Sequence, residues 1–194
     1  MEEKGKVKDR IVSAAWELFF KKGYGQTTVD DIIALSETSK GSFYYYFESK
    51  DSLLSTLSSV LDEKYEDLRN QMPAEMNAFE KLMYINYDVH KLMEEKIDRQ
   101  LLAHMYSTQL TTKGERHLLD QNRVYYRLIQ NIVTEGQKLG EITRDKTPSE
   151  ICKLYSIYER ALVSDWCLCQ GSYSLAEYSK EYMPIMMEHF RMKV

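Results

Sequence analysis

The chain has 194 residues, of which 43% are hydrophobic and 29% charged, and its formal net charge is −4. This acidic balance excludes a protein that binds nucleic acid through basic charge spread over its whole surface. The amino terminus is charged, and no apolar run approaches the roughly 18 residues of a membrane-spanning helix. We therefore expect a cytoplasmic protein without a membrane partner, built as a small domain joined to a larger one.

Three cysteines, Cys152, Cys167 and Cys169, show no spacing typical of a disulfide framework, which fits a reducing compartment. Cys167 and Cys169 have the spacing of a possible redox or metal pair. On a helix, however, residues two apart point in different directions, and no histidine stands nearby in the sequence. We expect buried structural thiols, and we predict neither a metal site nor a cofactor.

The first 54 residues contain several helix starts in close succession. A stripe of apolar residues from Ile11 to Phe19 has the spacing of one helical face, and Gly23 is placed to end that helix. Thr28 and Asp31 stand three residues apart and form a pair like a capping box, with Asp in place of Glu or Gln. This pair predicts the start of a second helix.

Two serines mark the starts of the next helices. Ser39 is placed to cap a short third helix, and Ser49 a long fourth helix that begins at Lys50 and runs to about residue 70. The order is helix, short helix, turn and short helix. This order is typical of a helix-turn-helix.

The third helix carries small residues, a lysine and a row of tyrosines between Ser39 and Phe47. In a major groove, Lys40 can reach guanine or a phosphate, and Gly41 lets the backbone approach closely. Phe43 and Phe47 lie one helical turn apart and are expected to pack inward. The alternative is a core lined by the tyrosines, but so short a helix cannot bury them all. We favour contact with DNA.

The residues predicted to contact DNA gather at helix starts and on this third helix. Helix amino termini favour phosphate because their backbone N–H groups are free and their dipole is positive. The predicted set is Thr28, Ser39, Lys40, Gly41, Ser42, Tyr44, Tyr45 and Lys50. Residues 1–54 contain eight basic and nine acidic side chains. We therefore expect modest affinity that needs a dimer.

Several short motifs occur together in this region. They are Arg10-Ile11, Ala14-Ala15, Leu18-Phe19, Gly23-Tyr24, Thr27-Thr28-Val29, Asp31-Ile32, and then Ser39, Gly41, Tyr44, Tyr46-Phe47, Ser49-Lys50-Asp51 and Leu53-Leu54. With these motifs, the first quarter of the chain resembles the DNA-binding domain of the TetR family of bacterial regulators. The resemblance implies an all-helical homodimer whose helix-turn-helix binds a palindromic operator and whose larger domain binds a small-molecule inducer.

The resemblance also implies roles for individual residues. Carried over by position, it assigns Thr28, Tyr44 and Lys50 to phosphate contacts. It assigns Lys40, Gly41, Ser42 and Tyr45 to the groove. One stretch departs from the family pattern, because the turn reads Leu35-Ser36-Glu37-Thr38 where the family usually has Ala-Gly-Val before the capping serine. Glu37 thus stands in place of glycine.

The remainder of the chain is predicted to be helical almost throughout. Helices are expected at about 50–70, 75–94, 97–110, 115–138, 148–169 and 174–191, with residues 111–114 as one connector. The predicted fold is all-α. It has a helix-turn-helix DNA-binding domain at residues 1–49, joined by a long helix to a helical bundle for ligand binding and dimerisation at residues 50–194.

The last two helices carry apolar and aromatic stripes of the kind enriched at interfaces. Two helices from each of two subunits would form a four-helix interface, as the resemblance also implies. The alternative is that the stripes only close the core of one subunit. Pro184 should kink or break the last helix. The predicted interface residues are Leu154, Tyr158, Leu162, Trp166, Tyr178, Tyr182, Ile185, Met186 and His189.

A ligand pocket is expected among the middle helices, which are rich in tyrosine and methionine. Such a lining suits a small hydrophobic or aromatic inducer, although the same residues at helical spacing also make plain core. The predicted lining residues are Met83, Tyr84, Tyr87, Leu102, Met105, Tyr106, Tyr125, Tyr126 and Tyr158. His90, Arg99, His104 and Glu159 are candidates for a polar anchor.

These features predict a ligand-responsive transcriptional regulator, by default a repressor that its inducer releases from the operator. The hypothesis rests on the continuity of the fourth helix from Lys50 to the break at Met72-Pro73, because a ligand that moves its end would change the spacing of the recognition helices. One alternative is a helical sensor or adaptor without operator binding. An all-α enzyme is less favoured, because no nucleophile–base pair or phosphate loop supports it.

Overall fold

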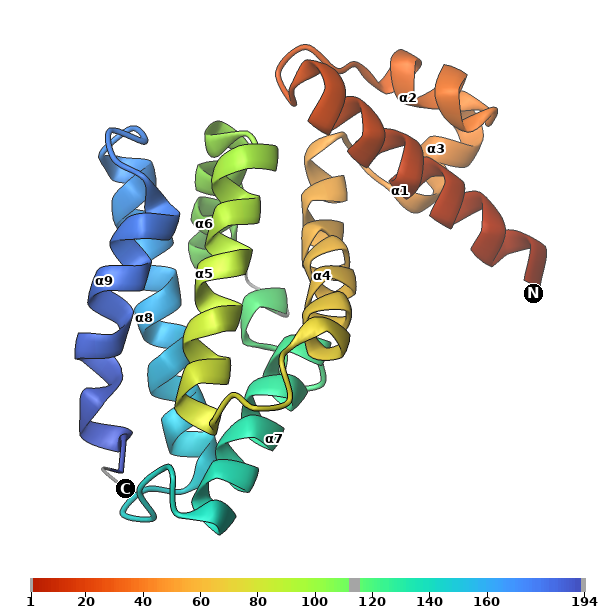
Figure 1. The fold of residues 1–194 in the computed structure, drawn as a ribbon. Coiled ribbons are helices and arrows are strands. Elements are labelled where there is room, and N and C mark those ends of the chain that lie inside the picture. Colours follow the sequence, from red (N-terminus) through yellow and green to blue (C-terminus); the bar gives the residue numbers. More distant parts are fainter. Residues whose placement is uncertain (1, 112–115, 193–194) are drawn as a thin grey trace.

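The computed structural model of the protein describes residues 2–111 and 116–192 (Figure 1). These residues form helices and no strand. The α-helices are α1 (Glu2–Lys22), α2 (Val29–Ser36), α3 (Lys40–Tyr46), α4 (Leu57–Gln71), α5 (Ala78–Lys96), α6 (Arg99–Thr111), α7 (Val124–Leu139), α8 (Pro148–Leu168) and α9 (Leu175–Met187). Short 3₁₀ helices are η1 (Asp51–Thr56), η2 (His117–Leu119) and η3 (Glu188–Phe190). The predicted all-α fold is confirmed.

The helices form two groups that share α4 (Figure 1). The first three helices make a small unit at one end of the molecule, and the later helices make a larger bundle in which α5 packs along α9, α7 packs on α8, and α4 lies against α5 and α7. No helix in the described ranges is long and apolar enough to cross a membrane. The arrangement places one connecting helix between the two groups.

Side-chain caps fix the geometry of the small unit. At the start of α2, the Asp31 N–H donates to Thr28 Oγ1 at 3.1 Å and the Thr28 N–H donates to Asp31 Oδ2 at 2.7 Å. At the start of α3, the Ser42 N–H donates to Ser39 Oγ at 3.0 Å. Gly23 follows α1 with a φ of 86°. The predicted capping box, the serine cap and the glycine terminator are therefore all confirmed.

The turn between α2 and α3 is closed by a residue in a left-handed conformation. Glu37 has φ 51° and ψ 45°. The Thr38 N–H donates to the Ile33 carbonyl oxygen at 3.2 Å, which closes the end of α2. Glycine normally fills this position because a Cβ there costs about 1–2 kcal/mol. The turn therefore forms with Glu37, at some cost in stability.

The fourth helix differs from its prediction. Residues 50–70 were expected to form one α-helix, but the chain makes η1 over Asp51–Thr56 before α4 begins at Leu57. The Trp16 indole N–H donates to Thr56 Oγ1 at 2.8 Å, and that hydroxyl donates to the Leu53 carbonyl oxygen at 2.6 Å. Because a local side-chain bond of this kind competes with the α-helical pattern, the segment is wound more tightly where it meets α1.

The start of one other helix was also predicted wrongly. The expected helix at residues 115–138 starts only at Val124 in the described residues, because the Asn122 N–H donates to Asp120 Oδ1 at 2.9 Å and forms a turn. Residues 112–115, which include part of a predicted connector, lie outside the described ranges. Pro184 does not end α9, which continues to Met187. The proline removes one backbone hydrogen bond near the end of that helix without breaking it.

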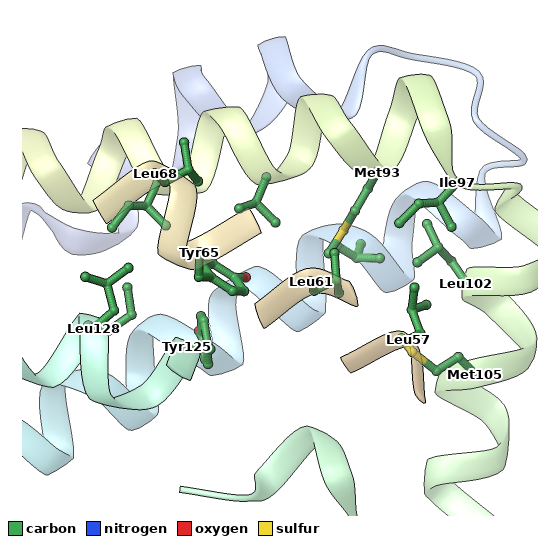
Figure 2. Close-up of a cluster of buried hydrophobic side chains, with 14 of the residues drawn as sticks. Leu57, Leu61, Tyr65, Leu68, Met93, Ile97, Leu102, Met105, Tyr125 and Leu128 are labelled. Carbon is green, nitrogen blue, oxygen red and sulfur yellow. The ribbon is translucent and has the colours of Figure 1, made fainter. Parts of the chain in front are cut away.

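One apolar core runs from the small unit into the bundle. Ile11, Ile32 and Phe43 are fully buried in the small unit, and Leu57 and Leu68 are fully buried along α4. Figure 2 shows α4 side chains inserted between α5 and α7. Burial of each such side chain contributes roughly 1.5–3 kcal/mol. The two groups are thus joined by packing as well as by the chain.

Replacing Glu37 by glycine is expected to raise the free energy of unfolding by about 1 kcal/mol, because glycine accepts the left-handed conformation without strain. Glu17→Gly is the matched control, since Glu17 is exposed inside α1. It should lower the same quantity by about 1 kcal/mol. Urea unfolding followed by circular dichroism measures both. A loss of stability in Glu37→Gly would contradict this account of the turn.

Candidate nucleic-acid interface and ligand cavity

The outer face of α3 carries the most exposed aromatic side chains of the small unit. Tyr44 is 49% exposed and Tyr45 is 68% exposed, whereas Phe43 is fully buried beneath them. A Cβ added at Gly41 would lie no closer than 3.8 Å to its nearest neighbour, the Ser39 hydroxyl oxygen. The surface above the first turn of α3 is therefore open to a close partner.

An open hollow of about 840 Å³ lies between α3 and the first turns of α1. Its lining joins the predicted residues Ser39, Gly41, Ser42 and Tyr45 to Lys6, Val7, Arg10 and Tyr46. The sequence prediction did not include Lys6 and Arg10, which line this hollow. Their spacing of four places both on one face of α1, which is the signal that could have found them. Two cations beside α3 make this hollow suitable for a phosphate backbone.

The ammonium group of Lys40 pairs with Asp30. The two groups lie 3.3 Å apart, and their side chains are 64% and 78% exposed. An ion pair this exposed contributes little and is screened by salt. A phosphate could therefore replace Asp30 at small cost.

Lys50 is more firmly held. Its Nζ donates to the carbonyl oxygens of Tyr24 and Thr27 at 2.8 and 2.9 Å and lies 4.1 Å from the centre of the Tyr24 ring. The side chain thereby fastens the α1–α2 loop to the start of η1. Thr28 is also engaged, since its hydroxyl donates to Asp31 Oδ2 at 2.6 Å. Phosphate contacts by Lys50 and Thr28 remain predictions.

A second feature is a small cavity of about 50 Å³ lined by residues of α4, α5, α6, η2, α7 and α8. The lining is Leu61, Tyr65, Val89, His90, Met93, Met105, Tyr106, Leu118, Arg123, Tyr125, Ser156, Glu159, Arg160 and Val163. In Figure 2, Leu61 lies toward Met93, and the Tyr65 ring faces the Tyr125 ring. The centres of those two rings are 5.0 Å apart. α4 therefore forms one wall of the cavity.

Only some of the predicted pocket residues line this cavity. Met105, Tyr106 and Tyr125 line it, together with two of the anchor candidates, His90 and Glu159. The other predicted lining residues are Met83, Tyr84, Tyr87, Leu102, Tyr126 and Tyr158, and none of them reaches it. Tyr87, for example, donates to Glu177 on α9 at 3.0 Å. Their pocket role remains a prediction without support from the cavity.

Glu159 lies at the polar end of the cavity, 8% exposed. Its Oε2 accepts a hydrogen bond from the Tyr125 hydroxyl, and its Oε1 accepts one from the Asn86 side-chain amide at 3.2 Å. The Ser156 hydroxyl oxygen lies 2.9 Å from the Tyr125 hydroxyl. Burial raises the pKa of the Glu159 carboxyl to about 6, and the hydrogen bonds from Tyr125 and Asn86 limit the rise. The carboxyl is therefore mostly ionised at neutral pH.

His90 lies one helical turn from Asn86 on α5. Its ring is 1% exposed, and its Nδ1 is buried without a hydrogen-bond partner among the described residues. Burial lowers the pKa of His90 to about 3, so the imidazole is neutral. A buried polar atom without a partner is costly and calls for a functional explanation.

The other two anchor candidates lie elsewhere. The His104 ring stacks against Tyr24 with 6.4 Å between ring centres, and its Nε2 lies 4.0 Å from an Asp51 carboxylate oxygen. The Arg99 carbonyl oxygen lies 3.9 Å from Cys167 Sγ. His104 thus connects α6 to the α1–α2 loop and to η1, and Arg99 lies near the end of α8.

The cavity borders an open mouth of about 430 Å³ on the surface. Tyr106, Leu118 and Arg160 line both spaces and separate them. The mouth also includes Leu110, which is 81% exposed, and Leu119, which is 50% exposed. An apolar molecule can therefore approach the cavity from this side.

The predicted dimer residues fall into two sets. Leu162 and Trp166 are buried within one subunit, where the Trp166 N–H donates to the Tyr173 carbonyl oxygen at 2.8 Å. The others are half-buried or exposed: Leu154, Tyr158, Tyr178, Tyr182, Ile185, Met186 and His189. On α8, Ile157 and Leu168 are also exposed, at 40% and 81%. The predicted residues Leu162 and Trp166 of α8 therefore face the core. The exposed apolar residues Ile157 and Leu168 of α8 were not part of the predicted interface.

The three cysteines are unpaired, and only Cys152 is buried. Cys167 is half-buried and Cys169 is exposed, so the expectation of three buried thiols was wrong for these two. Both lie at the carboxyl end of α8, where the helix runs out of the core. Burial raises the pKa of the Cys152 thiol to about 12, which leaves it unreactive. Among the described residues, no group of His, Cys, Asp and Glu could hold a metal ion.

The structure has an exposed helix-turn-helix, and one helix joins it to a larger helical bundle that contains a cavity. This architecture is typical of a transcriptional regulator with a sensor domain. Residues 11–57 match the family described as "Bacterial regulatory proteins, tetR family". The amino-terminal part of the chain is thus similar to the DNA-binding domain of the TetR family of transcriptional regulators.

Known regulators are similar to this chain over alignments of different lengths. The regulator QacR of Staphylococcus aureus is 41% identical over 61 residues, which cover 31% of this chain and about a third (32%) of QacR. The regulator HbdR of Aromatoleum sp. is 26% identical over 185 residues, which cover 93% of this chain and 79% of HbdR. The fold is similar to that of Thermus thermophilus FadR, a TetR-family transcriptional repressor solved with lauroyl-CoA, with a TM-score of 0.73, 21% identity and 96% of each chain covered.

The buried carboxyl of Glu159 predicts a pH effect on stability. Its pKa is about 6 in the folded protein and 4.5 as the ordinary value, so the folded state holds a proton that the unfolded state has released between these pH values. The free energy of unfolding should therefore fall as pH rises from about 4.5 to about 6, by roughly 2 kcal/mol from this group.

Glu159→Gln removes this contribution. The difference in unfolding free energy, variant minus wild type, should be about 2 kcal/mol larger near pH 7.5 than near pH 4.5. Urea unfolding at both pH values measures it, with the exposed Glu135→Gln on α7 as the control that should show no such change. An equal difference at both pH values would show that Glu159 is not a perturbed carboxyl.

Proposed function

We propose that the protein is a ligand-responsive repressor that binds a palindromic operator as a homodimer in the cytoplasm and leaves it when a small hydrophobic inducer binds. The observation that carries the proposal is the cavity wall formed by α4, because α4 continues from η1, and η1 contacts α1 of the helix-turn-helix unit. We propose the domain boundary between residues 49 and 50, just before η1 begins at Asp51. The match of residues 11–57 to the TetR-family model supports DNA binding.

The DNA-contacting surface proposed here is α3 with the first turns of α1. Tyr44, Tyr45, Lys40 and the open backbone at Gly41 face outward, and Lys6 and Arg10 add positive charge beside them. Base edges would be read mainly by the first turn of α3, and phosphates would be held by the cations and hydroxyl groups around it. Few cations mean modest affinity for each subunit, which favours binding as a dimer.

The dimer is proposed to form through the outer faces of α8 and α9. Tyr178, Tyr182 and Ile185 are 37%, 37% and 66% exposed and lie along one face of α9. Ile157 and Leu168 continue an apolar surface on α8. Aromatic and aliphatic side chains exposed in a row are typical of interface cores. Two such faces related by a two-fold axis would present two recognition helices to a palindrome.

Release is proposed to follow from the small size of the cavity. Ligand sites are usually about 300–1,000 Å³, several times the 50 Å³ of this cavity. A ligand must therefore displace the walls, and Leu61 and Tyr65 of α4 form one of them. Because α4 continues into η1 and the helix-turn-helix unit, its movement changes the position of α3. A coupling of about 1–3 kcal/mol between the two sites is typical.

A second connection runs through α6. Met105 and Tyr106 line the cavity, while His104, next to them on α6, contacts Tyr24 and approaches Asp51 in the small unit. Movement of α6 would thus act on the α1–α2 loop. The FadR neighbour was solved with lauroyl-CoA. A long apolar ligand of that kind would have to occupy the mouth as well as the enlarged cavity.

The alternative function is that of a helical sensor or adaptor without operator binding. Two observations favour it: Lys40 is paired with Asp30, and Lys50 is held by backbone carbonyl groups. Measured DNA binding separates the two functions. The relatives are named as transcriptional regulators and not as enzymes, which supports a regulator without catalytic activity.

Lys40→Ala is expected to weaken operator binding about tenfold or more and to lower the slope of log affinity against log salt by about 2 for a dimer. Gel shifts at two salt concentrations measure both, with the DNA upstream of the protein's own gene or a site selected from random DNA. The control is Lys138→Ala, an exposed lysine of α7 in the bundle. Unchanged affinity in a folded Lys40→Ala variant would contradict the proposed contact.

Ile185→Lys is expected to raise the dimer dissociation constant roughly 30-fold or more, because it places a charge on an apolar interface. Sedimentation equilibrium measures the association. Leu139→Lys provides the control, since Leu139 is 63% exposed at the end of α7, away from the proposed face. A variant at Ile185 that dimerises like the wild type would exclude this face.

A further inference from the structure

We propose that the inducer is an apolar molecule with a protonated primary or secondary amine, which the cavity binds between Glu159 and His90. This inference rests on the proposed function, since it assigns a ligand class to the same cavity. It follows from two buried groups at the polar end of the cavity, one carrying a charge and one lacking a partner.

The first group is the Glu159 carboxylate. Its hydrogen-bonding neighbours Tyr125, Asn86 and Tyr155 are all neutral, and Arg160 attracts the carboxylate without forming an ion pair with it among the described residues. A buried carboxylate that keeps its charge without a cation is costly. A cationic ligand group would offset that cost, and a second carboxylate would increase it.

The second group is the His90 imidazole. It is neutral, and Nδ1 has no partner among the described residues although the ring is 1% exposed. His90 follows Asn86 by one turn on α5, and the Asn86 amide donates to Glu159 Oε1 at 3.2 Å. Glu159, on α8, therefore contacts α5 at Asn86, about one helical turn from His90. A primary or secondary ammonium carries at least two N–H donors, one for each of these acceptors.

The arginines of the lining do not favour an anionic ligand inside the cavity. Arg123 is paired with Asp62, with its terminal nitrogen 2.9 Å from Oδ1 and its Nε 3.3 Å from Oδ2. Arg160 lies between cavity and mouth, 3.5 Å from the Tyr126 hydroxyl. The interior therefore keeps the negative charge of Glu159, and positive charge lies toward the outside.

The rest of the lining suits the body of such a molecule. Val89, Met93 and Val163 are aliphatic, and the rings of Tyr65, Tyr106 and Tyr125 offer faces that attract a cation. The cavity of 50 Å³ has room for an ammonium group but not for a hydrophobic body. The body would extend past Tyr106 and Leu118 toward the mouth, where Leu110 and Leu119 are exposed.

Isothermal titration of the full-length protein with three matched probes tests the proposal. The probes are 4-phenylbutylamine, its N,N,N-trimethyl derivative and 4-phenylbutyrate, which share an aromatic body and differ in the head group. The amine should bind at least about tenfold more tightly than the trimethyl derivative, which has no N–H donor, and than the carboxylate. Equal or tighter binding of the carboxylate, or no binding of the amine, would overturn the proposal.

Variants locate the head group. Glu159→Gln should weaken amine binding about 30-fold or more, while Glu135→Gln on the surface of α7 should leave it unchanged. Circular dichroism checks that Glu159→Gln folds. If it does not, the comparison of probes on the wild-type protein still decides. Wild-type affinity for the amine in a folded Glu159→Gln variant would overturn the proposal.

The same titrations distinguish this inference from the proposed function. They are made without DNA, so they report on the cavity alone. Gel shifts with the operator report on DNA binding alone. If the protein binds operator DNA and is released by the carboxylate but not by the amine, the proposed function is supported and the amine inference is contradicted. If the protein binds the amine but no DNA, the ligand class is supported and the repressor function is contradicted.

Discussion

The packing of α4 against the bundle at one end and against η1 at the other underlies the whole structure. Leu61, Tyr65 and Leu68 are buried between α5 and α7, and Leu57 lies beside Leu102 and Met105 of α6 (Figure 2). The same apolar core continues through η1 into the small unit. Close-packed cores rearrange between discrete states and do not deform continuously. A change at the cavity wall formed by α4 would therefore act on η1 and on the helix-turn-helix next to it.

The junction at η1 combines this packing with specific hydrogen bonds. Trp16 bonds to Thr56, and Lys50 binds the carbonyl oxygens of the α1–α2 loop. The Tyr24 hydroxyl donates to Asp51, and burial and that hydrogen bond raise the pKa of Tyr24. His104 of α6 contacts the same group. The junction is thus a compact polar cluster between the two parts of the chain, and it links the position of the small unit to α4 and α6.

The polar end of the cavity has a different character. Glu159, Asn86 and Tyr125 come from three helices that meet only in the folded bundle. Among the described residues, the Glu159 carboxylate forms no ion pair, and His90 Nδ1 on the same face of α5 as Asn86 has no hydrogen-bond partner. Groups of this kind lower stability, and proteins usually retain them for binding. A site with such groups and a volume of only about 50 Å³ favours a two-state response to ligand.

The helix-turn-helix could be predicted from the sequence because its signals are local: Thr28, Ser39 and Gly23 act within one turn of the chain, and the spacing of apolar residues decides which face is buried. Most bundle helices could be predicted in the same way. Which tyrosines line the cavity and which apolar stripe of α8 faces outward depend on tertiary packing, because Trp166 and Tyr158 are both aromatic and differ in what packs on them. The hydrogen bond between Asn86 and Glu159, which are 73 residues apart, and the hydrogen bond of Trp16 to Thr56 in η1 also form only in the folded chain. Contacts between segments that are far apart in the chain do not produce a periodic pattern in the sequence.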